Sequence, residues 1–180
     1  MSAGGDGDGD GVGDGDDETG RGGPNEGSPK ATTLVLPDPI ERAILEAARA
    51  SAPRECCGVL GGEFDPDVSH ARSHYPARNV ADEPRTRYRI DPEEQLAIFE
   101  QLEARDEEIV GFYHSHPRGP PGPSATDAEA AAWPDRSYMI VSFEGSSGDD
   151  NAVVRSWRWR DASGEDGQFE RERLEHSVGF

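Results

Sequence analysis

Short apolar runs and helically spaced apolar residues alternate along residues 31–180, a pattern that predicts both strands and helices. Strands are expected at residues 34–36, 57–60, 68–77, 88–90, 109–113, 138–143, 153–159 and 168–174. The apolar run at 57–60 is expected to stop at Gly61-Gly62, and the last two strands are expected to form a hairpin. This mixture indicates an α+β domain with a mixed or mainly antiparallel sheet.

Three helices are expected between the strands, each beginning at a residue whose side chain can cap backbone N–H groups. The expected caps are Asp38, Asp91 and Ser124, and a proline follows the first two directly. Glu94 occupies the capping-box position of the second helix, and Pro134 is expected to end the third. The expected buried faces are Ile40, Ala43, Ile44 and Ala47 in the first helix and Leu96, Phe99 and Leu102 in the second.

Residues 1–30 differ in composition from the rest of the chain. They hold 11 glycines and 8 acidic residues, and only Arg21 and Lys30 are basic. A segment with so little apolar surface is expected to be a disordered acidic tail. The remaining residues, 31–180, have the length of a single domain.

The net charge of −19, from 37 acidic and 18 basic residues, limits the partners of the chain. Nucleic acids and anionic membrane surfaces bind to a basic face, so neither is an expected partner. No apolar run approaches the ~20 residues of a membrane-spanning helix, and no charged-then-apolar leader opens the chain, which favours a cytoplasmic location. Lys30 is the single lysine, and this composition favours a salt-loving source, with an ordinary acidic protein from a GC-rich genome as the alternative.

The two cysteines, Cys56 and Cys57, are adjacent, and neighbours in sequence rarely form an unstrained disulfide. Because side chains alternate along a strand, one is expected to face the core and the other to pack elsewhere. His70 and His74, in the strand expected at 68–77, are interpreted as surface residues. Because the two cysteines are adjacent, no disulfide framework is expected.

Two histidines at the end of a predicted strand carry the candidate chemistry. His114 and His116 are two residues apart, so in an extended chain they point to one face, ~6.6 Å apart. Pro117 turns the chain, and Asp127 falls in the first turn of the helix that Ser124 begins. Two imidazoles and one carboxylate, with a fourth position open for water, are typical of catalytic rather than structural zinc.

A zinc hydrolase also needs a general base beside the reacting water. Glu55 lies just before the apolar strand at 57–60, where a buried carboxylate can face the metal. Glu63, at the other end of that strand, is the competing candidate. The residues alone favour Glu55 without excluding Glu63.

Several segments together resemble the JAMM (MPN+) metalloprotease family: Arg54 to Gly62, the block His114-Ser115-His116-Pro117, and the spacing from Ser124 to Asp127. The family pattern is Glu, a long gap, His-x-His, seven residues, Ser, two residues and Asp, and every position is filled here. Asn79 followed by Pro84, and the helix start at Asp91, also look like family features. The resemblance covers roughly residues 32–176 and implies the MPN fold, a curved mixed sheet flanked by helices in a cytidine-deaminase-like layout.

The resemblance implies a role for each motif residue. His114, His116 and Asp127 would bind one Zn²⁺ per chain. Glu55 would take a proton from the reacting water and pass it to the leaving amine. Ser124 would donate a hydrogen bond to the oxyanion of the tetrahedral intermediate, a role that competes with capping its helix.

The resemblance also implies a substrate. Family members cleave bonds after the C-terminal Gly-Gly of ubiquitin-like proteins, so the expected function is isopeptidase release of such modifiers from lysines of target proteins. One alternative is processing of the C-terminus of a sulfur-carrier protein, with a peptide or cysteine adduct as the leaving group. The other is a non-catalytic MPN scaffold. The expected partners are the modifier or sulfur-carrier protein and its conjugates, and the oligomeric state is left open.

Overall fold

The structure is a computed structural model that describes residues 31–143, 152–161 and 167–178. The tail expected at residues 1–30 lies outside the described residues, so its disorder stays a prediction. The elements follow one another as β1 (Thr33–Pro37), α1 (Asp38–Ser51), β2 (Cys57–Glu63), β3 (Val68–Ala77), α2 (Pro92–Ala104), β4 (Glu108–His116), α3 (Ala125–Ala130), β5 (Ser137–Ser142), β6 (Val153–Arg160) and β7 (Gln168–Ser177).

The strands of the described residues form one mixed sheet in the order β1-β3-β2-β4-β5-β6-β7, and this sheet closes into a barrel. The pairs β1–β3, β1–β7 and β4–β5 are parallel, and the other neighbouring pairs are antiparallel. Pairing of β1 with β7 closes the barrel. The expected mixed sheet is confirmed, closure was not expected, and the cytidine-deaminase-like layout stays a prediction.

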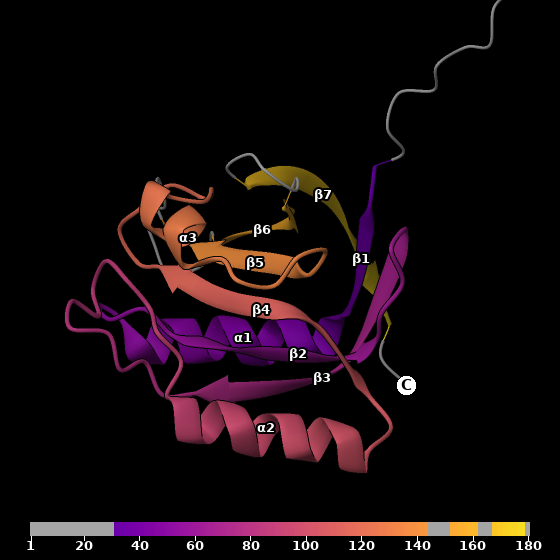
Figure 1. The fold of residues 1–180 in the computed structure, drawn as a ribbon. Helices are drawn as coiled ribbons and strands as arrows, with labels where there is room; N and C mark the ends of the chain where they lie inside the picture. The colour runs from indigo at the N-terminus through magenta and orange to yellow at the C-terminus, as the bar shows by residue number, and fades with distance from the viewer. Residues whose placement is uncertain (1–30, 144–151, 162–166, 179–180) are drawn as a thin grey trace, which may run out of the picture.

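Two helices pack on opposite faces of the sheet, because successive side chains of a strand point to opposite sides. α1 shares one core with Leu60 of β2, and α2 shares the other core with Val59. Figure 1 shows α2 running beside β3 at the lower edge of the domain. The buried helix residues are Ile40, Ile44 and Ala48 of α1 and Ile98 and Leu102 of α2.

The adjacent cysteines follow the same alternation. Cys56 belongs to the core under α1 and Cys57 to the core under α2, and both are buried free thiols. The two side chains point to opposite faces as expected, but both lie in a core, whereas only one was expected to face the core. His70 is exposed, as expected, whereas His74 is half-buried.

Two helices differ from the sequence expectations: α1 in its first residue and α2 in the side chains that it buries. α1 begins at Asp38 itself, and Pro37 is its N-cap without a capping side chain, so the expected Asp38 cap is wrong. In α2 the Leu96 side chain is 61% exposed although it was expected to be buried, because contact with the sheet selects the Ile98–Leu102 stripe instead. None of the described helices has the length and apolar character that a membrane span needs.

Asp91 caps α2 as expected, accepting hydrogen bonds from the backbone N–H groups of Glu93 and Glu94. The Glu94 carboxylate does not complete a capping box, because it accepts a hydrogen bond from the Arg78 backbone N–H instead. α3 ends at Ala130, four residues before the proline that was expected to end it.

Two strand expectations are corrected. β2 does not stop at Gly61-Gly62 but continues to Glu63 through a shift in register. Gly62 has a φ of 152°, which glycine adopts without the clash that a Cβ would cause. The strand expected at 88–90 is reduced to a single bridge between Asn79 and Ile90.

A buried ion pair joins β6 to β7. Arg158 and Glu172 are both fully buried, with Nη2 and Oε1 2.6 Å apart. Glu172 also accepts a hydrogen bond from the Ser156 hydroxyl, and Arg158 donates to the carbonyl oxygen of Asp135 and to the Ser69 hydroxyl of β3. A buried charge needs such complete pairing, so this network fixes β6 and β7 against β3.

Replacing Glu172 with glutamine removes the negative charge beside Arg158 at almost constant volume. We expect the free energy of unfolding to fall by about 3–5 kcal/mol, because a buried guanidinium loses its counter-charge. Glu175→Gln, which breaks the more exposed pair with Arg173 on the same strand, is the matched control and should cost less than about 1 kcal/mol. Urea unfolding followed by tryptophan fluorescence measures both variants, and equal losses would contradict the expectation.

Candidate metal centre

Strand β4 carries both candidate imidazoles on one face. His114 and His116 are the seventh and ninth residues of a nine-residue strand, and both are buried. Their Nε2 atoms lie 2.9 Å apart. The Nδ1 atom of His116 lies 2.9 Å from the carbonyl oxygen of Pro120, to which it donates a hydrogen bond when it carries a proton.

Asp127 reaches the same point from the first turn of α3. Its Oδ1 lies 3.1 Å from Nε2 of His114 and its Oδ2 lies 3.4 Å from Nε2 of His116. Burial opposes the charged form, but hydrogen bonds from the two histidines outweigh it and hold the pKa of Asp127 well below its usual range. The carboxylate is therefore ionised where the imidazoles meet.

Ser124 forms a capping box with Asp127. The Asp127 backbone N–H donates to Ser124 Oγ at 3.1 Å, and the Ser124 backbone N–H donates to Asp127 Oδ2 at 2.6 Å. The Ser124 hydroxyl also donates to Oδ2, at 2.7 Å. The expected capping role of Ser124 is thus confirmed, and its single hydroxyl proton is directed at Asp127.

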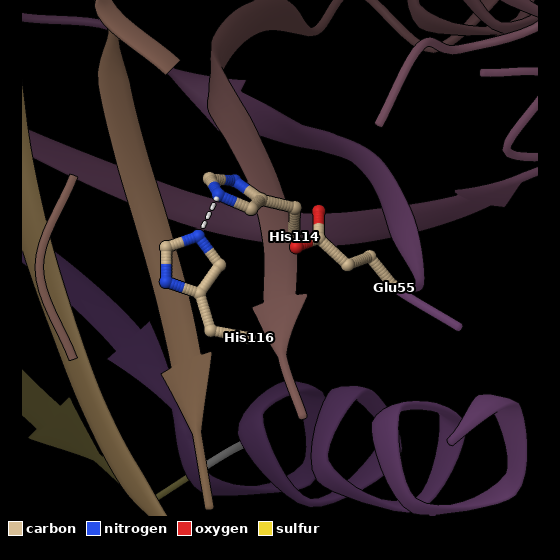
Figure 2. Close-up of side chains that lie close together, drawn as sticks. All are labelled: Glu55, His114 and His116. Carbon is tan, nitrogen blue, oxygen red and sulfur yellow. Dashed lines mark hydrogen bonds between the residues drawn. The ribbon is translucent and has the colours of Figure 1, made fainter. Parts of the chain in front are cut away.

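Glu55 enters from the turn before β2, and Figure 2 shows it reaching toward the two imidazoles. One of its carboxylate oxygens and one nitrogen of each ring lie within 4.8 Å of one another. Among the described residues Oε2 of Glu55 has no hydrogen-bond partner, and the side chain is buried. Burial raises the pKa of Glu55 from 4.5 to about 7, with His116 lowering it and Asp127 raising it further.

Glu63, the competing base, lies away from this cluster. It is exposed at the far end of β2 and pairs with Arg72 at 2.6 Å. Cys57, at the near end of β2, lies opposite His114. The structure therefore brings Glu55 to the histidines and leaves Glu63 outside.

The backbone on either side of Glu55 is held in place by hydrogen bonds. Ser115 accepts a hydrogen bond from the Cys56 N–H at its Oγ and donates its own N–H to the Cys56 carbonyl. The Glu55 N–H donates to the carbonyl oxygen of Pro84 at 2.7 Å, and its carbonyl accepts from Nδ2 of Asn79 at 3.1 Å. Glu55 is thus fixed by β4 on one side and by the 79–90 segment on the other.

Asn79 is a buried residue whose side chain connects several backbone groups. In the sequence it stood out only as a family feature. Its Nδ2 also donates to the Arg87 carbonyl, and its Oδ1 accepts from the backbone N–H groups of Ala81 and Arg89. The segment between these contacts carries Tyr88, whose ring stacks on His114 at 4.3 Å and 21°. No signal in the sequence marked Tyr88, because its partner ring is 26 residues away along the chain.

Two openings flank the cluster. The first, the Tyr88 groove, has a volume of about 580 Å³, and its lining includes Ala81, Glu83, Tyr88, Arg89, Thr126 and Glu129. The second, the proline-loop pocket, has a volume of about 240 Å³ and is lined by Glu55, Arg85, Thr86, His116 and the loop that runs from His116 to Ser124.

Comparison with known proteins places this chain in a family. A family model described as prokaryotic homologs of the JAB domain matches residues 37–160. A desampylase of Haloferax volcanii is 48% identical over 100 residues, which are 56% of this chain and 70% of that protein. A CysO-cysteine peptidase of Mycobacterium tuberculosis is 38% identical over 109 residues, 61% of this chain and 73% of that protein.

Two solved structures share the fold. Protein DSY2949 from Desulfitobacterium hafniense superposes with a TM-score of 0.67 at 29% identity, covering 81% of this chain and 94% of that one. A protein from Salinibacter ruber superposes with a TM-score of 0.56 at 28% identity, covering 80% and 91%.

The raised pKa of Glu55 predicts how the free energy of unfolding depends on pH. The prediction is for protein treated with a chelator, so that no metal is bound. The folded state holds this proton more tightly than the unfolded state, so the folded form loses stability as the pH rises from about 4.5 through about 7. Glu55→Gln removes this cost and should make the chelated protein more stable than the wild type at pH 8, by up to about 3 kcal/mol.

Urea unfolding at pH 8 and at pH 4.5 tests this expectation. The stability difference between the variant and the wild type should shrink toward zero at pH 4.5, where Glu55 is protonated in the folded state. A difference that is the same at both pH values would refute the assignment.

Proposed function

The chain belongs to the prokaryotic JAB-domain family, and from that premise we propose that it is a zinc-dependent isopeptidase. It is a peptidase that hydrolyses linkages of ubiquitin-like modifiers, an assignment supported by relatives named desampylase and CysO-cysteine peptidase. The bond that we propose is the one after the C-terminal Gly-Gly of the modifier, and the partners are the modifier and its conjugates.

One arrangement carries the proposal. A buried carboxylate, Glu55, has one oxygen without a hydrogen-bond partner among the described residues and lies beside two imidazoles. A second carboxylate, Asp127, is hydrogen-bonded to both rings. Unpaired buried polar atoms are costly and cluster at functional sites, so this arrangement points to hydrolytic chemistry.

We assign the metal to His114, His116 and Asp127. Two imidazole nitrogens and a carboxylate oxygen are a typical donor set for catalytic zinc, and all three groups converge here. The hydrogen bond from His116 Nδ1 to the Pro120 carbonyl would orient that ring, and Tyr88 would orient His114 by stacking. When bound, zinc would polarise the scissile carbonyl and make water a stronger nucleophile.

We assign general acid–base catalysis to Glu55. A carboxylate with a pKa of about 7 can accept a proton from the attacking water near neutral pH and return it to the leaving amine. Asp127 is unsuited to this role, because its pKa lies well below the usual range. The two buried carboxylates thus have different tasks because their surroundings move their pKa values in opposite directions.

For Ser124 we propose hydrogen-bond donation to the oxyanion. Its hydroxyl points at Asp127 Oδ2 in this structure, so the proton has to turn away from that oxygen as negative charge develops on the substrate. The backbone part of the capping box remains when it does, because the Ser124 N–H holds Oδ2 independently.

The second candidate function is processing of the C-terminus of a sulfur-carrier protein, with a peptide or cysteine adduct as the leaving group. It uses the same residues and differs only in the group joined to the carboxyl end of the Gly-Gly. The relative named CysO-cysteine peptidase favours keeping it as the alternative. The third expectation, a non-catalytic scaffold, is wrong for a chain whose relatives are peptidases.

The decisive experiment is cleavage of a ubiquitin-like protein joined through Gly-Gly to a lysine ε-amine, measured in molar KCl. We expect the wild type to cleave it, a zinc chelator to abolish cleavage, and Glu55→Gln to lower the rate at least ~100-fold, because the general base is lost. Glu63→Gln is the control, since Glu63 lies at the far end of β2. Cleavage that persists in Glu55→Gln or in chelator would refute the mechanism.

Asn79→Ala tests whether the 79–90 segment positions the base. The substitution removes the hydrogen bond to the Glu55 carbonyl without touching the proposed metal ligands. We expect kcat to fall about tenfold or more while the zinc content, measured by atomic absorption, stays at that of the wild type. Gln101→Ala, which removes an exposed side-chain amide from α2, should leave both unchanged. Loss of zinc together with kcat would instead indicate general disruption of the site.

A further inference from the structure

Three arginines share one face of the sheet at β6 and β7. Arg155 and Trp157 are two residues apart on β6, so their side chains point to the same side. Arg171 of β7 lies opposite Trp157, and its guanidinium carbon lies 5.2 Å from the centre of the Trp157 ring. Arg173 is two residues further along β7 and points the same way. These three arginines form a surface that we call the arginine patch.

The arginine patch carries positive charge that the described residues do not balance. Arg171 and Arg173 are exposed, and Arg155 is half-buried. Among the described residues Arg173 pairs with Glu175 at 3.1 Å, whereas Arg155 and Arg171 have no ion pair. Partial burial and the nearby charge of Arg155 lower the pKa of Arg171. In a chain of net charge −19, two neighbouring guanidinium groups without a counter-charge favour an anionic partner.

The acidic part of the N-terminal segment joins the fold beside this patch. Seven acidic residues and no basic residue lie between residues 6 and 18. Where the segment meets β1, Thr33 lies opposite Arg173, and the Thr32 carbonyl accepts a hydrogen bond from the Arg173 N–H at 2.8 Å. Because β1 and β7 are parallel, the chain before Thr33 lies at the level of Arg171. The charge that the patch lacks is therefore attached next to it.

The distance along the chain allows the contact. Fifteen residues lead from Glu18 to Thr33, and a random chain of that length spans ~20 Å on average. Arg171 lies one strand from β1 and Arg155 lies two strands from it, ~5 Å and ~10 Å across the sheet. Attachment therefore keeps the acidic stretch at a high effective concentration around the patch.

We propose that residues 6–18 dock on the arginine patch of the same chain. Carboxylates accept the paired N–H donors of guanidinium groups, and Arg155 and Arg171 supply two such groups on one face. The glycines between the acidic residues have no side chain that would keep the backbone away from the sheet. Salt weakens the contact, because the Debye length falls from ~10 Å at 0.1 M to ~3 Å at 1 M.

The arginine patch borders the candidate metal centre. His114 lies opposite Ile140 of β5, and Ile140 lies opposite Arg155, so Arg155 is two strands, ~10 Å, from His114 on the same face. A Cβ added at Gly122 would lie 3.9 Å from the Trp157 ring, so the loop that lines the proline-loop pocket reaches the patch. The docked stretch therefore covers the surface beside that pocket.

Paramagnetic relaxation enhancement tests the contact in the full chain. A nitroxide label is attached at Gly13→Cys, and the two cysteines of the chain itself are buried. We expect the label to broaden the backbone amide signals around Arg155 and Arg171 at least about threefold more in ~0.1 M than in ~1 M KCl, because salt screens exposed ion pairs. A variant with every acidic residue between 6 and 18 replaced by Asn or Gln, the neutral tail, gives the broadening that attachment alone causes.

Substitutions in the patch test the other side of the contact. Arg155→Gln combined with Arg171→Gln should reduce the broadening in ~0.1 M KCl to the level of the neutral tail, because the guanidinium donors are lost. Arg42→Gln combined with Arg105→Gln is the matched control. It removes the same charge from exposed positions on α1 and at the end of α2, so it should leave the broadening at the wild-type level.

Equal broadening with the wild-type and the neutral tail, or broadening that does not change with salt, would overturn the proposal. A mixture of spin-labelled chain and unlabelled, isotope-enriched chain then shows whose tail is bound. Broadening in the mixture as strong as that within one chain would assign the contact to a second copy and refute docking within the chain. Salt-dependent broadening that is absent from the mixture supports the proposal.

Discussion

The register between β2 and β4 is the constraint on which the site depends. Cys57 lies opposite His114. The Cys56 N–H donates to Ser115 Oγ, and the Cys56 carbonyl accepts from the Ser115 N–H. Continuing this pairing by one residue sets Glu55 beside His116, on the face that the histidines share. A slip of one residue would turn Glu55 to the other side of the sheet, since side chains alternate along a strand. Ser115 therefore contributes to the site without touching a reacting group.

The 79–90 segment provides further contacts that the site needs besides the pairing of β2 with β4. The 79–90 segment supplies the Pro84 carbonyl to Glu55, the Tyr88 ring to His114, and the walls of the Tyr88 groove. Asn79 joins the two ends of the segment through hydrogen bonds with Arg87 and Arg89, and a further hydrogen bond to the Glu55 carbonyl ties the segment to the base. These backbone contacts hold Glu55 in its buried position, although Oε2 of its side chain has no hydrogen-bond partner among the described residues.

Local patterns were enough to predict most elements but not how they meet. The strands at 68–77 and 153–159, the cap at Asp91 and the convergence of Asp127 on the two histidines follow from spacing and capping chemistry. Closure of the barrel depends on β1 pairing with a strand about 140 residues later, which no local pattern encodes. Leu96 was misplaced because tertiary contact, not the apolar repeat, decides which stripe of α2 is buried. Tyr88 acts through His114, which is 26 residues away along the chain, so its spacing carries no signal.

The parallel pairing of β1 with β7 also has a mechanical consequence. The two strands run side by side from Thr33 opposite Arg173 to Pro37 opposite Ser177. A force that draws the start of β1 and the end of β7 apart slides these strands along each other. Their inter-strand hydrogen bonds then carry the load together and in shear, instead of opening one at a time like a zipper.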